Sequence, residues 1–229
     1  MKWGVISFPG SLDDRDALYA LREVLGQDAI SLWHKDETLD GVGCVVLPGG
    51  FSYGDYLRTG AIARFAPIMK SVARFAAEGG LVIGICNGFQ ILCEAHLLPG
   101  ALTRNRSLSF ICEWVTLRVE NRRTAFTNRT REGALLRLPI KHGEGSYVAP
   151  EEELAAMEKR GQVILRYVDE RGRDSDEANP NGSMHSIASV ANERFNVFGL
   201  MPHPEHAVEP MLGGEDGLSL FRSIVASAA

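Results

Sequence analysis

One cysteine in this chain stands where a nucleophile would be placed. Cys86 follows a short apolar run, Leu81 to Ile85, and glycines lie two positions away on each side of it. The spacing of the apolar residues after it predicts a helix that begins just past the cysteine. This is the glycine-x-nucleophile-x-glycine elbow, and the N-terminal end of the following helix would favour a thiolate over a thiol. The alternative is a core cysteine beside a helix start.

A histidine and a glutamate far downstream could serve that cysteine. Residues 197–201 read as a buried strand that runs into Pro202, His203, Pro204 and Glu205. Prolines favour extended backbone before them, and side chains two apart in an extended segment face the same side. A nucleophile needs a base, and the base needs an orienting group. Cys86, His203 and Glu205 supply all three, whereas taken alone His203 reads as a surface histidine in a proline-rich turn.

Two adjacent glycines follow another buried strand, Val45 to Leu47. Gly49 and Gly50 precede Phe51, and backbone N–H groups at such a turn can approach a ligand closely. Together with the N–H of Asn87, the residue after the cysteine, they would form an oxyanion hole. An ordinary Gly-Gly turn is the alternative.

The motifs together resemble a known enzyme family. Gly84 to Gln90, with the distant Pro-His-Pro-Glu at 202–205, is similar to the class I glutamine amidotransferases. Three longer stretches, residues 48–58, 142–145 and 179–183, narrow the resemblance. They are similar to the glutaminase subunits of phosphoribosylformylglycinamidine synthases. The match extends from Phe8 to Ala207.

This resemblance implies a reaction and partners. L-glutamine would be hydrolysed through a γ-glutamyl thioester on Cys86. The ammonia would pass to an ATP-dependent synthetase subunit that aminates formylglycinamide ribonucleotide in purine biosynthesis, often with a small third subunit. We expect no cofactor and no metal in this chain, which has no Walker A loop. ATP and Mg²⁺ are expected in the synthetase partner.

The resemblance also suggests substrate-binding residues. The backbone at His142 and Gly143 would hold the amino-acid end of glutamine. Gln90 lies one helical turn past Cys86, where its amide could reach the substrate or cap the helix. The sequence departs from the family at Leu12-Asp13, where Asn-Cys is usual, and at His206, where arginine is common. We expect neither departure to touch the chemistry of Cys86, His203 and Glu205.

Strand and helix patterns alternate along the chain. Apolar spacing predicts helices over 14–26 and 59–78, framed by buried strands near residues 3, 42 and 81. This βαβ order predicts an α/β fold, a doubly wound, mostly parallel sheet with helices on both faces, which the resemblance describes as flavodoxin-like. Residues 110–119 alternate like an antiparallel extension, and 218–225 read as a last helix. We expect one glutamine amidotransferase domain over residues 1–229.

Composition excludes several classes of protein. The chain has 229 residues, is 45% hydrophobic and carries a net charge of −5, so we expect no binding to nucleic acid or membrane surfaces. It begins with a strand pattern rather than a signal peptide, and no apolar stretch would span a bilayer. None of the four cysteines forms a C-x-x-C pair, which fits a reduced, cytoplasmic location.

Two other functions stay open on the sequence alone. One is a different enzyme with the same chemistry, either a stand-alone γ-glutamyl hydrolase or the glutaminase subunit of another pathway. The other is a non-catalytic regulatory subunit that retains the fold. A synthetase partner that controls the activity would complete or order the site on docking. Two polar, glycine-containing segments could respond to it: residues 48–60 and the long loop ending at 179–183.

Overall fold

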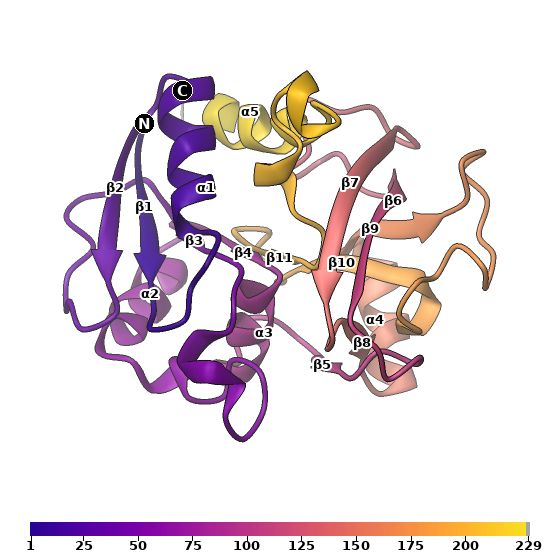
Figure 1. Ribbon diagram of the computed structural model, residues 1–229, viewed down its shortest axis with the longest axis horizontal. Coiled ribbons are helices and arrows are strands. Elements are labelled where there is room, and N and C mark those ends of the chain that lie inside the picture. The colour runs from indigo at the N-terminus through magenta and orange to yellow at the C-terminus, as the bar shows by residue number, and fades with distance from the viewer. Residues whose placement is uncertain (228–229) are drawn as a thin grey trace.

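A nine-stranded mixed sheet organises the molecule (Figure 1). The computed structural model describes residues 1–227. The strand order is β2-β1-β3-β4-β11-β10-β9-β6-β7, and β5 pairs separately with β8. The strands are β1 (Lys2–Ser7), β2 (Asp28–Trp33), β3 (Cys44–Leu47), β4 (Leu81–Ile85), β5 (Ala101–Thr103), β6 (Ile111–Val119), β7 (Leu135–His142), β8 (Ser146–Val148), β9 (Val163–Val168), β10 (Ile187–Ala191) and β11 (Val197–Leu200).

The sheet has a parallel and an antiparallel part. β2, β1, β3, β4 and β11 pair in parallel, and β4 registers Gly84 against Gly199 of β11. From β11 outward, β10, β9, β6 and β7 pair antiparallel. The predicted parallel core and antiparallel extension are therefore confirmed.

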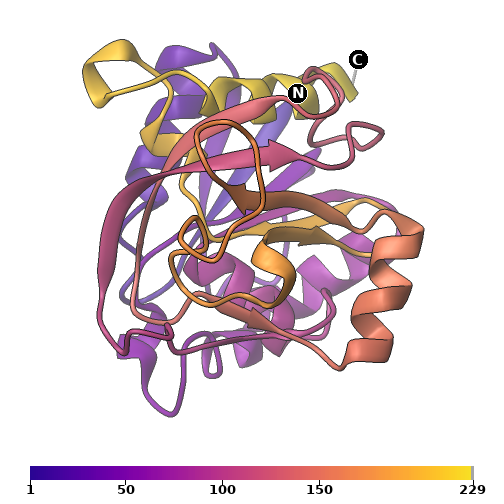
Figure 2. The ribbon, with the colours of Figure 1, turned by 90° about the vertical axis from the view of Figure 1, so that its right-hand side faces the viewer.

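Helices cover both faces of the parallel part. α1 (Asp14–Tyr19) and α5 (Gly217–Ser227) lie on one face, and α2 (Pro67–Ala77) and α3 (Asn87–Glu94) lie on the other (Figures 1 and 2). α4 (Glu151–Arg160) lies beside the antiparallel extension (Figure 2). The short helices are η1 (Ala20–Val24), η2 (Ser52–Asp55), η3 (Ala63–Phe65), η4 (Met184–Ser186), η5 (Pro204–His206) and η6 (Pro210–Leu212).

The helix expected over residues 59–78 is shorter than predicted. α2 begins only at Pro67, and Ala66 before it is extended at φ −58° and ψ 141°. Proline restricts the preceding residue to such conformations and is tolerated in the first helical turn, where no N–H is needed. The segment before it forms a turn and the single 3₁₀ turn η3 instead.

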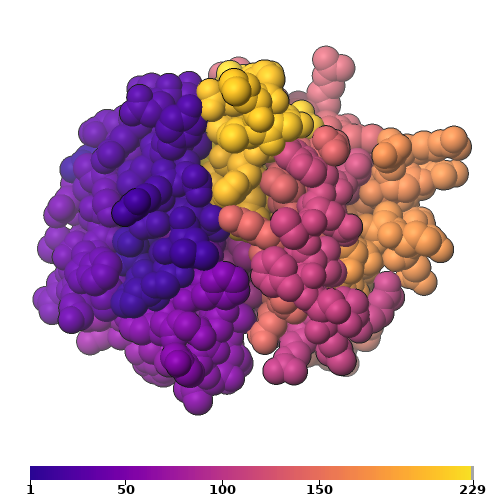
Figure 3. Space-filling model, in the orientation of Figure 1, coloured from indigo at the N-terminus to yellow at the C-terminus, as the bar shows by residue number. Residues whose placement is uncertain are grey.

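The carboxyl ends of the central parallel strands meet at one edge of the sheet. Buried apolar side chains such as Val45, Ile83 and Phe198 fill the core, and each is 0% exposed. The C-terminal segment lies between the N-terminal half and the antiparallel extension on the face shown in Figure 3. Parallel α/β sheets place their ligands beyond these strand ends.

Among the described residues, no helix is long and apolar enough to cross a membrane.

Candidate active site

Cys86 lies on a strained turn between β4 and α3. Its backbone has φ 51° and ψ −105°, its N–H donates to Leu200 O at 2.8 Å, and 5% of its surface is exposed. The unusual angles fall on the cysteine, not on the flanking glycines. Those glycines provide space, because a Cβ on Gly88 would collide with Leu47 O and one on Gly84 with Leu92. The elbow is therefore fixed by close packing of α3 against β3 and β4.

His203 and Glu205 form a buried pair just past the end of β11. His203 Nδ1 lies 2.6 Å from Glu205 Oε1, and both side chains are 1% exposed. The His203 N–H donates to Pro139 O at 2.8 Å, which ties this segment to β7. Glu205 belongs to the 3₁₀ turn η5 rather than to the extended segment that the sequence predicts. The two side chains still converge, because the turn directs both toward the same side of the chain.

The other ring nitrogen of His203 is available for proton transfer. Nε2 is buried and has no hydrogen-bond partner among the described residues. Burial lowers the pKa of His203, but the charges of Glu205 and Cys86 outweigh it, so the pKa is raised to about 10. The histidine is thus charged near neutral pH. The Cys86 thiol itself is 3.8 Å from Lys141 O.

The Gly49-Gly50 turn is held against the loop that follows β1. Gly49 O accepts hydrogen bonds from the N–H groups of Leu12 (3.2 Å) and Asp13 (3.3 Å). Gly50 has φ 137°, and a Cβ there would lie 2.6 Å from Leu12 N. Only glycine fits this approach. The N–H of Asn87 is in the first turn of α3, where it has no partner within the helix.

A cavity of about 180 Å³ opens beside the thiol. Of the residues named from the sequence, Gly50, Phe51, Cys86, Gln90, His142 and Gly143 line it. Asp55, Thr59, Phe110, Lys141 and Glu144 also line it, and sequence reasoning did not single them out. The volume equals that of about six liquid water molecules (~30 Å³ each), which suits a small ligand rather than a peptide.

Gln90 and Asn87 connect three loops around the cavity. Asn87 Oδ1 accepts from the N–H of Ser52 at 3.1 Å, and Asn87 Nδ2 donates to Gln90 Oε1 at 2.9 Å. Gln90 Nε2 then donates to Glu144 O at 2.5 Å. Both ends of the Gln90 amide therefore bond to the protein, and the side chain braces the cavity wall rather than capping the helix.

His142 is a second buried histidine beside the cavity. Its Nδ1 lies 3.0 Å from Asn105 Oδ1, which also accepts the N–H of Gly145 at 3.0 Å. A Cβ on Gly145 would collide with the His142 ring, so only glycine lets this turn close. Burial, with the charge of His203 adding to it, lowers the pKa of His142 to about 4. His142 is thus neutral near pH 7.

The Asn179–Ser183 stretch supports the His142–Gly145 turn from behind. Asn181 is 0% exposed, and its Nδ2 donates to Gly145 O at 2.8 Å. Ser183 Oγ donates to the same carbonyl at 3.3 Å and accepts the N–H of Tyr147 at 3.0 Å. This end of the long loop is therefore a buried brace, unlike the responsive segment that the sequence suggested.

Asp13 and His206 lie against the proposed base, which contradicts the expectation that these departures avoid the chemistry. Asp13 Oδ2 is 3.6 Å from His203 Nδ1, and His206 Nε2 is 3.4 Å from Asp13 Oδ1. Sequence reasoning missed this because Asp13, Lys141 and His206 come from three distant segments. Asp13, His203, Glu205 and His206 have ligand atoms within 4.8 Å of one another. Asp13 Oδ1 already accepts a hydrogen bond from Lys141 Nζ, and His203 Nδ1 is already bonded to Glu205 Oε1. We therefore assign no metal there.

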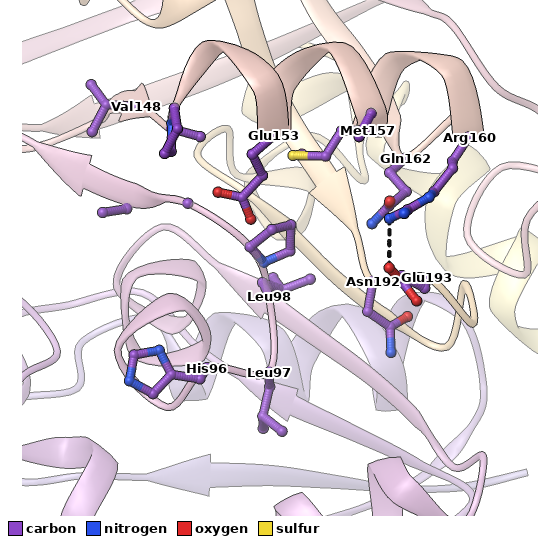
Figure 4. Close-up of a pocket in the computed structure, with 16 residues that line it drawn as sticks. His96, Leu97, Leu98, Val148, Glu153, Met157, Arg160, Gln162, Asn192 and Glu193 are labelled. Atoms are coloured by element: carbon purple, nitrogen blue, oxygen red, sulfur yellow. Dashed lines mark hydrogen bonds and ion pairs between the residues drawn. The ribbon is translucent and has the colours of Figure 1, made fainter.

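A larger hollow lies elsewhere and contains none of these residues. It measures about 730 Å³ and lies between the end of α3, β5 and α4 (Figure 4). Leu98 and Met157 line it, and at one end Arg160 pairs with Glu193 at 2.5 Å. Its size does not make it the reaction site, because Cys86, the candidate nucleophile, lines the smaller cavity and not this one.

Comparison with known proteins places the chain in a family. The profile of the CobB/CobQ-like glutamine amidotransferase domain matches residues 1–213. The phosphoribosylformylglycinamidine synthase subunit PurQ of Moorella thermoacetica is 58% identical over 225 residues, covering 98% of this chain and 95% of the relative. The subunit of the same name from Methanosarcina barkeri is 54% identical over 225 residues, covering 98% of this chain and 97% of the relative.

Solved structures agree with these relatives. A chain in the structure of PurLQS from Thermotoga maritima superposes with a TM-score of 0.89 at 46% identity, covering 100% of this chain and 99% of that chain. A glutamine amidotransferase from the same organism matches at a TM-score of 0.62 and 16% identity, covering 99% and 97%, and it shows the fold alone. The chain belongs to the glutamine amidotransferases and, among them, to the PurQ family of phosphoribosylformylglycinamidine synthase subunits.

Proposed function

We propose that this chain hydrolyses L-glutamine to glutamate and ammonia with Cys86 as nucleophile, His203 as acid and base, and Glu205 as orienting group. One observation carries the proposal. The strained cysteine elbow at the end of β4 and the buried His203–Glu205 pair at the end of the adjacent strand β11 meet at one edge of the sheet. Family membership makes glutamine the substrate that this arrangement fits.

The first half-reaction breaks the amide. The Cys86 thiolate attacks the side-chain carbonyl carbon, and the carbonyl electron pair moves onto oxygen. Backbone N–H groups at Gly50 and Asn87 stabilise this oxyanion. When the C–N bond breaks, the nitrogen takes the proton of His203 and leaves as ammonia, and a γ-glutamyl thioester remains.

The second half-reaction returns the enzyme to its starting state. Neutral His203 takes a proton from water, and the hydroxide attacks the thioester carbon. The C–S bond then breaks, which regenerates the thiolate and releases glutamate. Glu205 holds His203 Nδ1 at 2.6 Å throughout, so Nε2 stays directed at the reaction.

The cavity walls hold the amino-acid end of glutamine. His142 and Gly143 offer backbone groups, as the family resemblance suggests. Two acidic side chains also line the cavity, and they are Asp55 and Glu144. Burial, together with the charge of Glu144, raises the pKa of Asp55 to about 6, and Asp55 Oδ1 is buried without a partner among the described residues. We infer that these carboxylates bind the α-ammonium group.

The ammonia is passed to a synthetase partner. Free ammonia is of no use to this chain, whose sequence has no Walker A loop for ATP. Curated relatives bear the name of a phosphoribosylformylglycinamidine synthase subunit. In de novo purine biosynthesis the partner would use ATP and Mg²⁺ to convert formylglycinamide ribonucleotide to the amidine, with a small third subunit completing the complex. Such a complex would act in the cytoplasm, with residues 1–229 as one domain of it.

The Cys86→Ala variant tests this function in the reconstituted complex. Synthesis with glutamine as nitrogen donor should fall by on the order of 10⁶-fold, as loss of the nucleophile does in a serine hydrolase. Synthesis with ammonium salt should remain, because the synthetase site lies on the partner. Near-normal glutamine-dependent synthesis by Cys86→Ala would show that Cys86 is not the nucleophile.

Covalent labelling identifies the nucleophile directly. A diazo-ketone analogue of glutamine should add one mass equivalent at Cys86, located by peptide mass spectrometry. Cys44 and Cys93 are buried, and burial raises the pKa of each thiol, so both are poor nucleophiles. Cys112 is exposed, and a Cys112→Ser variant is therefore the matched control. A non-catalytic subunit would show no glutamine-protected label at Cys86.

The synthetase partner is expected to activate this chain through residues 48–60. Tyr53, Asp55 and Leu57 have positive φ, and Tyr56 and Leu57 are 73% and 89% exposed. Non-glycine residues in this region store strain of about 1–3 kcal/mol each. Because Gly50 begins the same loop, docking there would position an oxyanion donor and change the rate by on the order of 10²-fold. Equal glutaminase rates with and without synthetase and its ligands would instead support an independent hydrolase.

A further inference from the structure

Three charged or polar side chains meet behind the His203–Glu205 pair. The Asp13 side chain is 3% exposed, and its Oδ1 accepts a hydrogen bond from Lys141 Nζ at 2.5 Å. Its Oδ2 lies 3.6 Å from His203 Nδ1. His206 Nε2 lies 3.4 Å from Asp13 Oδ1 and 3.5 Å from Glu205 Oε1. A second carboxylate is therefore beside the ring nitrogen that Glu205 already binds.

The backbone fixes Asp13 at this position. Its N–H donates to Gly49 O at 3.3 Å, and its carbonyl accepts the N–H of Ala17 at 2.9 Å at the start of α1. Gly49 separates the carboxylate from the imidazole, and a Cβ there would collide with Asp13 Oδ2 and lie 2.8 Å from His203 Cε1. The glycine that precedes the oxyanion donor thus also lets Asp13 approach the histidine.

Charge compensation keeps Asp13 ionised despite its burial. Burial alone would raise the pKa of Asp13, but hydrogen bonding to His206 and Lys141 and the charges of His203 and Lys141 hold it well below its usual range. Burial likewise opposes the charge of Lys141, whereas Asp13, Glu205 and Cys86 raise its pKa. The site therefore contains two carboxylates and two cations in close contact, and removal of one partner would leave a buried charge uncompensated.

We propose that Asp13, held by Lys141, is a positioning residue for His203, and that the pair sets the protonation balance of the proposed base. The inference rests on the proposed function, in which His203 carries the proton. Lys141 is the second-to-last residue of β7, and its carbonyl lies 3.8 Å from Cys86 Sγ. The ion pair therefore also ties the wall of the cavity to the Gly49 turn.

The two members of the pair act on His203 with opposite sign. Removing the negative charge of Asp13 leaves Lys141 uncompensated and disfavours the imidazolium. Removing the positive charge of Lys141 leaves Asp13 uncompensated and favours it. The charged and titratable groups around the ring in these packed elements are Asp13, Asp16, Cys86, Lys141, His142, Glu205 and His206.

A double-mutant cycle that removes each charge in turn tests the proposal in the full chain. The variants are Asp13→Asn, which keeps the shape of the side chain, Lys141→Met, and the double variant. The titration of His203 is followed by NMR of histidine-labelled protein, and glutaminase pH profiles are recorded with the synthetase complex. We expect the His203 midpoint to fall by about one pH unit in Asp13→Asn, to rise in Lys141→Met, and to return toward the parent value in the double variant.

Controls separate this inference from the function itself. Arg160→Met breaks a surface ion pair away from the cavity and should leave the His203 midpoint unchanged. Signals of His34, His96 and His185 report whether each variant is folded. Midpoints that shift the same way in both single variants, or that do not return in the double variant, would assign the pair a purely structural role. Failure of the triad would appear separately, as glutamine-dependent synthesis that survives in Cys86→Ala.

Discussion

Two buried histidines near the cavity have similar geometry and opposite electrostatics. His203 Nδ1 contacts a carboxylate oxygen of Glu205 at 2.6 Å, and His142 Nδ1 contacts an amide oxygen of Asn105 at 3.0 Å. In each ring, Nε2 is buried and lacks a partner among the described residues. The pKa of His203 is raised by Glu205 and Cys86 against the effect of burial, whereas burial and the charge of His203 lower that of His142 to about 4.

The difference shows what makes a histidine suitable for proton transfer. Burial alone favours the neutral ring, and a buried carboxylate at Nδ1 reverses that preference. His203 can therefore donate a proton near neutral pH, and His142 cannot. The neutral ring of His142 instead packs against Gly145 and shapes the turn that lines the cavity.

Replacing each of the two histidines should have the largest effect on activity and should distinguish their roles. His203→Ala should lower glutaminase kcat by about 10²-fold or more, because a general acid and base is lost from both half-reactions. Glu205→Gln should lower it less, since the amide still holds Nδ1 but no longer stabilises the charged ring. His142→Gln should affect KM more than kcat. Steady-state kinetics check this, and a Glu205→Gln enzyme weaker than His203→Ala would overturn the division.

The two histidines should also affect stability differently as the pH changes. His142 has an ordinary pKa of 6.5 when unfolded and about 4 when folded, so the unfolded state binds an extra proton between these values. Stability is therefore lost as pH falls through this window, by up to about 3 kcal/mol. His203 has a raised pKa, so it is protonated in both states over most of this window and adds little slope. Its own contribution is lost only as pH rises through that raised pKa.

Urea unfolding from pH 7 to pH 4 measures the prediction. The His142→Gln variant keeps an amide donor for Asn105 and cannot titrate, so the difference between parent and variant isolates this histidine from the carboxylates. The parent should lose up to about 1.4 kcal/mol more per pH unit than the variant. Parallel stability curves would mean that His142 is not held neutral by the fold.

The sequence indicated the proposed catalytic residues more clearly than the residues that surround them. Cys86, His203 and Glu205 could be proposed from the sequence because a nucleophile elbow and a proline-flanked histidine leave local patterns. Asn105, Asp13 and Lys141 leave none, since each acts on a residue far away in the chain. The helix expected over 59–78 was too long, because apolar spacing outweighed the single signal of Pro67. The polarity of 179–183 indicated a segment that could respond to a partner, whereas Asn181 and Ser183 are buried partners of Gly145 O.

Removal of Asn105 should show that the His142 side of the cavity depends on hydrogen bonds. Asn105 is 0% exposed. Its side-chain oxygen accepts the N–H of Gly145, and its side-chain nitrogen donates to His142 O at 2.8 Å and to Ser109 O at 2.9 Å. Asn105→Ala leaves buried polar groups unpaired, which costs about 1–3 kcal/mol of folding stability. KM for glutamine should rise with kcat little changed. Asn128→Ala, near the surface end of α5, is the control and should affect neither.

Asn105→Asp should make His142 more like His203, with the smallest effect of the series. The new carboxylate would face Nδ1 and favour the imidazolium, so the pKa of His142 should rise from about 4 by roughly one unit. The rise stays limited because burial and the charge of His203 still oppose the proton. NMR titration of labelled histidine, with Asn105→Ala as the uncharged reference, measures the shift. A midpoint that stays near 4 would mean that burial, and not the partner at Nδ1, distinguishes the two histidines.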